Sequence, residues 1–253
     1  MSEMPVNESK ARVRGASPAG ATDAQSAART VRKMFTAIAP HYDLLNHLLS
    51  ANVDKHWWRR TAATFSPLLS RPNARVLDLC CGTGDMTFAL RRAGPQAQIT
   101  GADFSHAMLR LALKKSDGVT GLKWIEADAL QLPFADDSFD LLTSAFGFRN
   151  LADYDAGLRE IHRVLKPGGQ FGILEFSEPK GILGKLYRFY FKQVLPRIGG
   201  LVSGTSAYSY LPASVEKFPS PAELASRMTA VAFRKVEWVP YTFGIAGLYR
   251  GTK

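Results

Sequence analysis

The stretch Val76-Leu77-Asp78-Leu79-Cys80-Cys81-Gly82-Thr83-Gly84-Asp85 decides the fold. An apolar run leads into a turn with two glycines, and a segment with helical spacing follows. The pattern therefore predicts a buried strand, a tight turn and the start of a helix. Gly82 and Gly84 let the backbone turn sharply and approach a ligand with no Cβ in between. This arrangement is typical of α/β folds that bind a nucleotide-like ligand.

The charges around this turn indicate the kind of ligand. A pyrophosphate favours a bare helix N-terminus, but here Asp85 begins the helix and Asp78 ends the strand. Thr87 also replaces the third glycine of the dinucleotide fingerprint G-x-G-x-x-G. A ligand with a positive centre and no phosphate suits this turn better. S-adenosylmethionine, with its sulfonium and ammonium groups, fits that description.

Two further acids follow predicted strands. Asp103 comes about 20 residues after the glycines, where an acid typically accepts hydrogen bonds from a ribose. Asp128 ends the next strand and could accept from the exocyclic amine of an adenine; a turn aspartate is an equally good interpretation of Asp128 taken alone. Because both acids end strands of one alternating series, we expect them, with Asp78, Gly82 and Gly84, to contact the cofactor.

Strands and helices alternate along most of the chain, which predicts a doubly wound, mostly parallel sheet. Seven strands are expected, and the last two should form an antiparallel hairpin: 75–79, 98–102, 122–126, 139–144, 169–176, 235–239 and 246–249. Helices are expected over 54–69, 85–92, 105–115, 154–165 and 221–231, and helical spacing also covers 27–49 up to a break at Pro40. We expect residues 1–25 to be disordered, residues 26–253 to form one domain, and residues 26–70 to act as a helical lid.

Composition narrows the remaining possibilities. The 253 residues are 46% hydrophobic, and no apolar run is long enough for a membrane-spanning helix. The two cysteines, Cys80 and Cys81, are neighbours, which disfavours a disulfide between them. Two cysteines are also too few for a metal site. We therefore expect a cytoplasmic protein without a metal. The net charge of +10 suits nucleic acid or an anionic membrane, but no zinc-ligand spacing or RNA-binding motif favours nucleic acid.

One segment combines positive charge with apolar side chains. Residues 181–202 combine several aromatic side chains with Lys185, Arg188, Lys192 and Arg197. Such a helix suits the interface of an anionic bilayer, on the inner face of the membrane. A helix that covers the core or mediates a homodimer explains the apolar residues equally well. We therefore expect residues 181–215 to be an insertion that faces the substrate or the membrane.

Several motifs carry a family resemblance. The glycine turn, Asp103, Leu132-Pro133-Phe134 and Ser138-Phe139-Asp140 resemble class I S-adenosylmethionine-dependent methyltransferases. More specific stretches resemble the ubiquinone/menaquinone biosynthesis C-methyltransferases: Tyr42-Asp43-Leu44-Leu45-Asn46, Phe146-Gly147-Phe148-Arg149-Asn150, Arg163-Val164-Leu165-Lys166-Pro167-Gly168-Gly169, Leu174-Glu175-Phe176-Ser177 and Tyr208-Ser209-Tyr210-Leu211-Pro212. The resemblance runs in order from about Val31 to the C-terminus.

The resemblance implies transfer of a methyl group to a ring carbon of a polyprenylated quinol. It adds Thr83 and Ala129 to the expected cofactor contacts. Asp54-Lys55 stands where the family often has His-Arg, which resembles the menaquinone branch more than the ubiquinone branch. Demethylmenaquinol is thus the expected substrate, and the ubiquinone-pathway benzoquinol is the alternative.

Methylation of a ring carbon requires an electron-rich ring, and loss of the phenolic proton makes the ring more electron-rich. Arg149 could stabilise the phenolate or orient a water, or could form an ordinary salt bridge. Asn150 could align the ring oxygen or cap the following helix. The remaining candidates are His41 as a base, Tyr42 and Asp43 as a lid, and Tyr208 and Tyr210 as walls of the ring pocket.

Two functions of other classes remain open at this point. An O- or N-methyltransferase acting on another small molecule would share the cofactor half. A non-catalytic cofactor-binding partner of a membrane enzyme complex is disfavoured by the intact glycines and acids.

Overall fold

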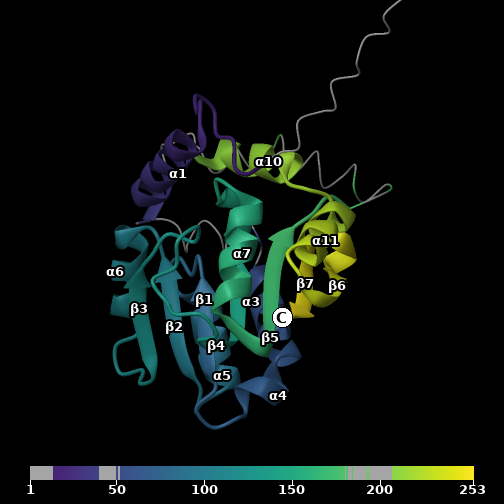
Figure 1. Cartoon of the computed structure of the whole chain (residues 1–253). Coiled ribbons are helices and arrows are strands. Elements are labelled where there is room, and N and C mark those ends of the chain that lie inside the picture. Colours follow the sequence, from purple (N-terminus) through teal and green to yellow (C-terminus); the bar gives the residue numbers. More distant parts are fainter. Residues whose placement is uncertain are drawn as a thin grey trace, which may run out of the picture.

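A parallel sheet with helices on both faces organises the molecule (Figure 1). The computed structural model describes residues 14–39, 50, 52–179, 181, 184, 193 and 207–253, with only the backbone at 207–209. Within these residues, seven strands lie in the order β3-β2-β1-β4-β5-β7-β6. Five strands are parallel, and β7 is antiparallel to both β5 and β6. The predicted doubly wound sheet with its C-terminal hairpin is confirmed.

The strand bounds are β1 Arg75–Leu79, β2 Gln98–Asp103, β3 Leu122–Glu126, β4 Phe139–Ala145, β5 Leu165–Phe176, β6 Arg234–Tyr241 and β7 Ala246–Thr252. The helices are α1 Ala24–Ile38, α3 Val53–Thr64, α4 Ser66–Leu69, α5 Asp85–Ala93, α6 His106–Lys115, α7 Tyr154–Val164, α10 Ala207–Lys217 and α11 Pro221–Ala230. Two short 3-10 turns matter below: η2 Phe148–Asn150 and η4 Thr242–Gly244.

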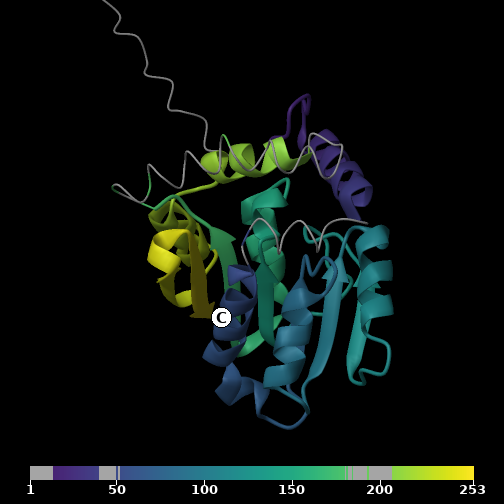
Figure 2. The same cartoon turned by 180° about the vertical axis from the view of Figure 1, so that it is seen from behind.

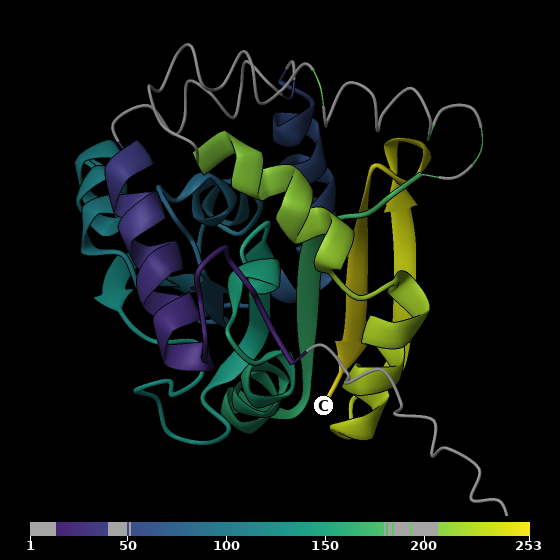
Figure 3. The ribbon, with the colours of Figure 1, turned by 90° about the horizontal axis from the view of Figure 1, so that it is seen from above.

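Each face of the sheet carries an apolar core, because alternate strand residues point to opposite faces. Leu77 packs with residues of α7 and α11 on one face, whereas Val76 packs with residues of α3, α4 and α5 on the other. The view from behind shows α3 and α5 in front of the sheet (Figure 2). Figure 3 looks onto the edge where the parallel strands end, and α1 and α10 lie across it.

One predicted helix in the N-terminal part is divided. The expected helix 54–69 is two helices, because Pro67 lacks an N–H and lies in the first turn of α4, which begins after Phe65. In the segment before α1, Tyr154 N donates to Arg14 O, Ala16 N donates to Leu151 O, and Asp23 caps α1. Of the described part of 26–70, α1 lies across the strand ends, and α3 and α4 pack in the core; the lid stays a prediction.

The end of α7 also differs from the prediction. Strand β5 begins at Leu165, directly after the helix, and the Pro167-Gly168-Gly169 turn lies inside it as an irregularity. Phe139 pairs with Leu165, but Leu141 pairs with Gln170, so the turn is excluded from the ladder. Gly168 has a φ of +76°, which a residue without a Cβ tolerates.

Candidate functional site

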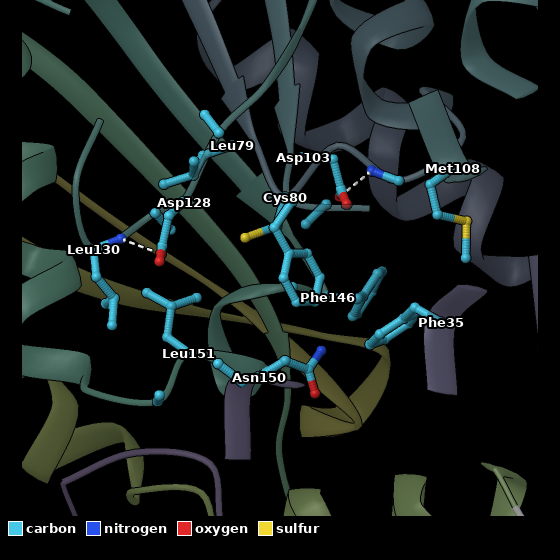
Figure 4. A pocket seen from close by; sticks show the side chains of 18 residues that line it. Phe35, Leu79, Cys80, Asp103, Met108, Asp128, Leu130, Phe146, Asn150 and Leu151 are labelled. Carbon is cyan, nitrogen blue, oxygen red and sulfur yellow. Dashed lines mark hydrogen bonds between the residues drawn. The ribbon is translucent and has the colours of Figure 1, made fainter. Parts of the chain in front are cut away.

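A cavity lies at the carboxyl edge of the sheet, where open α/β folds bind ligands (Figure 4). It encloses about 750 Å³ of empty space, part of which is open to solvent. Its wall comes from the ends of β1, β2 and β4, the loop after β3, and helices α1 and α6. The lining residues are Ala28, Phe35, Leu79, Cys80, Gly82, Asp103, Phe104, Met108, Ala127, Asp128, Ala129, Leu130, Ala145, Phe146, Gly147, Asn150, Leu151 and Ala152.

The glycine turn forms one wall through its backbone. Cys80, Gly82 and Gly84 all have a positive φ, of 55°, 55° and 91° respectively. Gly82 lines the cavity and donates its N–H to Asp103 Oδ2 at 2.8 Å. Gly84 instead lies against the core, since a Cβ there would sit 2.6 Å from the ring of Trp124. The two glycines thus serve different needs: access to the cavity and close packing.

Asp103 is held firmly at the cavity wall. Its Oδ1 accepts from Ser105 N and its Oδ2 from Gly82 N, both at 2.8 Å, and the side chain is buried. Burial raises the pKa of this carboxyl to about 6, although the backbone hydrogen bonds act against the shift. Each oxygen retains a second lone pair, so the carboxylate can still accept from a ligand hydroxyl.

Asp128 reaches the cavity from the loop after β3 (Figure 4). Its Oδ1 accepts from Leu130 N at 2.9 Å, which is an Asx-type turn. The side chain is exposed and also lines the cavity, so the turn interpretation is confirmed and contact with a ligand stays a prediction. Its neighbour Ala129 is buried and contributes to the same wall.

The structure does not bring Asp78 and Asp85 to the cavity. Asp78 is fully buried and accepts from the hydroxyls of Thr87 and Thr143. Burial raises the pKa of Asp78 to about 7. Asp85 forms an ion pair with Lys115 at 3.0 Å, and the same ammonium donates to Thr83 Oγ1. The acids that line the cavity are therefore Asp103 and Asp128, and the acids beside the glycines lie outside its lining.

Arg149 and Asn150 are neighbours with different surroundings. Arg149 lies outside the cavity lining, in a buried ion pair with Glu175 whose Nη1–Oε2 distance is 3.0 Å. It also donates to Phe146 O and to Ser214 Oγ. Asn150 lines the cavity, and its buried Oδ1 has no hydrogen-bond partner among the described residues. The predicted alternative, that Asn150 caps the next helix, is wrong, because Asp153 caps α7.

Tyr210 lies near this pair, on α10. The residue is half-buried, but its hydroxyl oxygen is buried and has no partner among the described residues, and burial raises the pKa of the phenol. The side chain of Tyr208, all of His41, Tyr42 and Asp43, and most of 181–202 lie outside the described residues. The roles predicted for them stay predictions.

Sequence reasoning missed the apolar walls of the cavity. Phe35 comes from α1 and Met108 from α6, and neither belongs to a recognisable motif. Phe146 carries the one available signal, since it begins the Phe-Gly-Phe-Arg-Asn stretch and has a φ of +59°. Flat apolar walls beside two carboxylates suit an adenosine: the base packs between side chains, and the polar edges meet Asp103 and Asp128.

Two absences hold for the part of the chain that the structure describes. None of its helices is long and apolar enough to cross a membrane. None of its His, Cys, Asp and Glu side chains form a group of three or more that could hold a metal ion.

Comparison with known proteins places the chain among methyltransferases. The model of the ubiE/COQ5 methyltransferase family matches residues 22–253. A demethylmenaquinone methyltransferase of Deinococcus radiodurans is 49% identical over 91% of this chain and 95% of its own length. One of Thermus thermophilus is 48% identical over 87% of this chain and its whole length. A ubiquinone/menaquinone biosynthesis C-methyltransferase of Geotalea daltonii is 46% identical over 88% of this chain and 96% of its own length.

Solved structures agree on the fold. The [4+2]-cyclase SpnF has a TM-score of 0.67 at 17% identity and covers 95% of this chain and 99% of its own. An S-adenosylmethionine-dependent methyltransferase of Thermotoga maritima has a TM-score of 0.58 at 20% identity, with coverages of 87% and 99%. At these identities the likeness concerns the fold alone.

Proposed function

The chain belongs to the ubiE/COQ5 methyltransferase family, and from this premise we propose that it methylates a ring carbon of demethylmenaquinol. It is an S-adenosylmethionine-dependent C-methyltransferase of quinone biosynthesis. The observation that favours a naphthoquinol substrate over a benzoquinol substrate is the 48–49% identity to two proteins named demethylmenaquinone methyltransferase.

The cavity fits the methyl donor. Asp103 has free lone pairs for a ribose diol, Asp128 can accept from an adenine amine, and Phe35, Phe104 and Met108 supply apolar walls. Bound there, S-adenosylmethionine supplies an electrophilic methyl group on a sulfonium. The carboxylates near it favour its positive charge. The apolar walls exclude water, which would otherwise compete for the cavity.

The chain's main contribution to the transfer is orientation of the ring. Asn150 Oδ1 is a buried acceptor in the cavity wall without a partner among the described residues, which is costly unless a ligand satisfies it. We assign it to the phenolic O–H, which it would orient and hold while electron density moves to the ring carbon. Arg149 would be a positioning residue. Its contacts with Glu175 would hold the turn η2 in place and so keep Asn150 in the cavity wall. His41 remains a predicted base.

Peripheral contact with an anionic membrane through 181–202, and a homodimer, belong to the same proposal. Both are supported by the sequence pattern of a segment that lies outside the described residues. A lipophilic quinol also favours catalysis at the bilayer surface.

Methyl transfer from labelled S-adenosylmethionine to reduced, short-tailed quinols tests the proposal. We expect demethylmenaquinol to gain one methyl group on a ring carbon, faster than the ubiquinone-pathway quinol does. Asn150→Ala should lower kcat by about tenfold or more, since one hydrogen bond to a developing charge is lost. Its affinity for the cofactor should stay within about twofold, because nothing assigns Asn150 to the donor.

Three outcomes would contradict this assignment. Faster labelling of the benzoquinol would favour the ubiquinone pathway. Label on oxygen or nitrogen would indicate an O- or N-methyltransferase. Cofactor binding without transfer to any quinol would leave the substrate unassigned.

A further inference from the structure

Phe243 is the most exposed large apolar side chain in the described part of the chain. Its exposed fraction is 81%, against 62% for Leu113 and 38% for Val119. It lies in η4, the turn between β6 and β7. A phenyl ring left in water forgoes the stabilisation that burial would provide.

The backbone holds this ring outward. Thr242, Phe243 and Gly244 have φ values of 45°, 57° and 87°, three left-handed residues in succession. Only glycine adopts that region without cost, and a β-branched threonine is among the least suited. Strain of this kind persists where the surroundings over-determine it, and it gathers at functional positions.

The surroundings are indeed rigid. Thr242 Oγ1 accepts from Trp57 Nε1 at 2.8 Å, and Gly244 O accepts from Ser177 Oγ at 2.6 Å. Ser177 N also donates to Ile245 O. The turn is therefore tied to α3 on one side and to the end of β5 on the other.

Positive charge lies on the helix at one side of the turn, and one exposed acid, Glu178, follows Ser177 at the other side. Helix α3 packs beside the turn, since Arg60 lies 4.1 Å from the ring centroid of Tyr241, the residue before η4. Lys55, Arg59 and Arg60 are all exposed on this helix, whereas its one acid, Asp54, is only 4% exposed. The outward face of α3 therefore carries cations without an exposed carboxylate.

This surface lies at the same edge as the cavity. Ala246, at the start of β7, pairs with Phe176, at the end of β5. The ring of Phe176 lies 4.4 Å from that of Phe146, which lines the cavity. Figure 3 looks onto this edge, and the yellow turn of β6 and β7 reaches it.

We propose that Phe243 and the exposed cations Lys55, Arg59 and Arg60 form a docking surface for an anionic lipid bilayer. The ring enters the boundary between headgroups and acyl chains, and the cations meet the lipid phosphates. The choice of a bilayer rests on the proposed function, because a polyprenyl tail favours lipid over water at every methylene. The residues that form this surface all lie within the described part of the chain.

Flotation of the full chain with vesicles, without substrate, tests the surface. Wild type should bind phosphatidylglycerol-rich vesicles and bind phosphatidylcholine vesicles weakly. Phe243→Ser should lower the partition coefficient by about tenfold. Leu113→Ser, which removes an exposed apolar side chain on α6, should leave it within about twofold. Lys55→Glu should weaken binding to the anionic vesicles, and Lys114→Glu on α6 should weaken it less.

Equal binding by wild type and Phe243→Ser, or binding indifferent to lipid charge, would overturn the proposal. So would a Phe243→Ser chain that loses a dimer in light scattering but keeps its vesicle binding, since the ring would then meet a second copy. With a short-tailed quinol in solution, Phe243→Ser should methylate at the wild-type rate. Failure of the quinol assignment would instead abolish transfer in wild type and leave the vesicle result unchanged.

Discussion

The carboxylate of Glu175 binds Arg149 at two places. Its Oε2 lies 3.0 Å from Arg149 Nη1, and its Oε1 accepts from the backbone N of the same residue at 3.0 Å. The exposed fractions of the two side chains are 8% for Arg149 and 0% for Glu175. One buried acid at the end of β5 thus fixes both the backbone and the side chain of the turn that places Asn150 in the cavity wall.

Glu175→Gln should destabilise the protein strongly. The substitution leaves the Arg149 charge buried without a counter-ion, so the free energy of unfolding should fall by about 3 kcal/mol. Glu237→Gln is the matched control, because Glu237 pairs with Arg250 on the surface and should change stability by less than about 1 kcal/mol. Urea unfolding measures both. Equal losses in the two variants would show that the buried pair contributes no more than the surface one.

Asp103→Asn should weaken cofactor binding. The amide cannot accept from Gly82 N and Ser105 N at once while also facing a ribose, and it carries no charge. Loss of a hydrogen bond to a charged group, about 1.5–3 kcal/mol, corresponds to about a 10- to 100-fold rise in Kd. Titration calorimetry with S-adenosylmethionine measures the change. Asp85 lies beside the glycine turn but outside the cavity, so Asp85→Asn should change Kd far less. A larger effect of Asp85→Asn would indicate that Asp85, and not Asp103, contacts the cofactor.

Asp78 should make the protein less stable as the pH rises. Burial raises its folded-state pKa to about 7 from the ordinary value of 3.8. The folded state therefore binds more protons than the unfolded state between these values, and stability falls as the pH rises through this window, then levels off above it. Asp78→Asn removes this titration. The unfolding free energy of wild type minus that of the variant should fall from pH 5 to pH 8, and a constant value would contradict the shift.

Gly101→Ala should destabilise β2 through Trp124. A Cβ at position 101 would lie 2.4 Å from Trp124 Cζ3, so the ring must move, which costs about 1–3 kcal/mol. In the background Trp124→Leu the same substitution should cost less, because the ring is gone. A double-mutant cycle on unfolding free energies measures the coupling. Additive losses would mean that the ring accommodates the methyl group.

Most of the fold could be predicted from the sequence because the evidence for it is local. Strand β3 covers the predicted residues 122–126, and the other six strands appear where apolar runs predict them. Helix α6 begins one residue inside its prediction, since Ser105 is its N-cap. A proline inside an apolar pattern, Pro67, divides a helix that the pattern predicts as one. A polar segment can also form hydrogen bonds to a distant part of the chain, as Tyr154 N does to Arg14 O.

The candidate site could be predicted only in part. Asp103, Asp128, Gly82, Ala129 and Asn150 line one cavity, as the positions of strand ends require. The direction of each side chain depends on neighbours far away in the sequence. Asp78 faces Thr143 because β1 and β4 pair in that register, and Arg149 turns from the cavity to Glu175.

The sequence by itself determined the order of strands and helices along the chain, the glycine turn and the edge of the sheet where the cavity lies. Periodicity and turn chemistry act over a few residues, so the chain carries them locally. Only the tertiary structure decided which acids face the cavity, which acid pairs with Arg149, and that Phe243 stands in solvent. Each of these depends on strand register and on burial, and both arise when segments distant along the chain pack together.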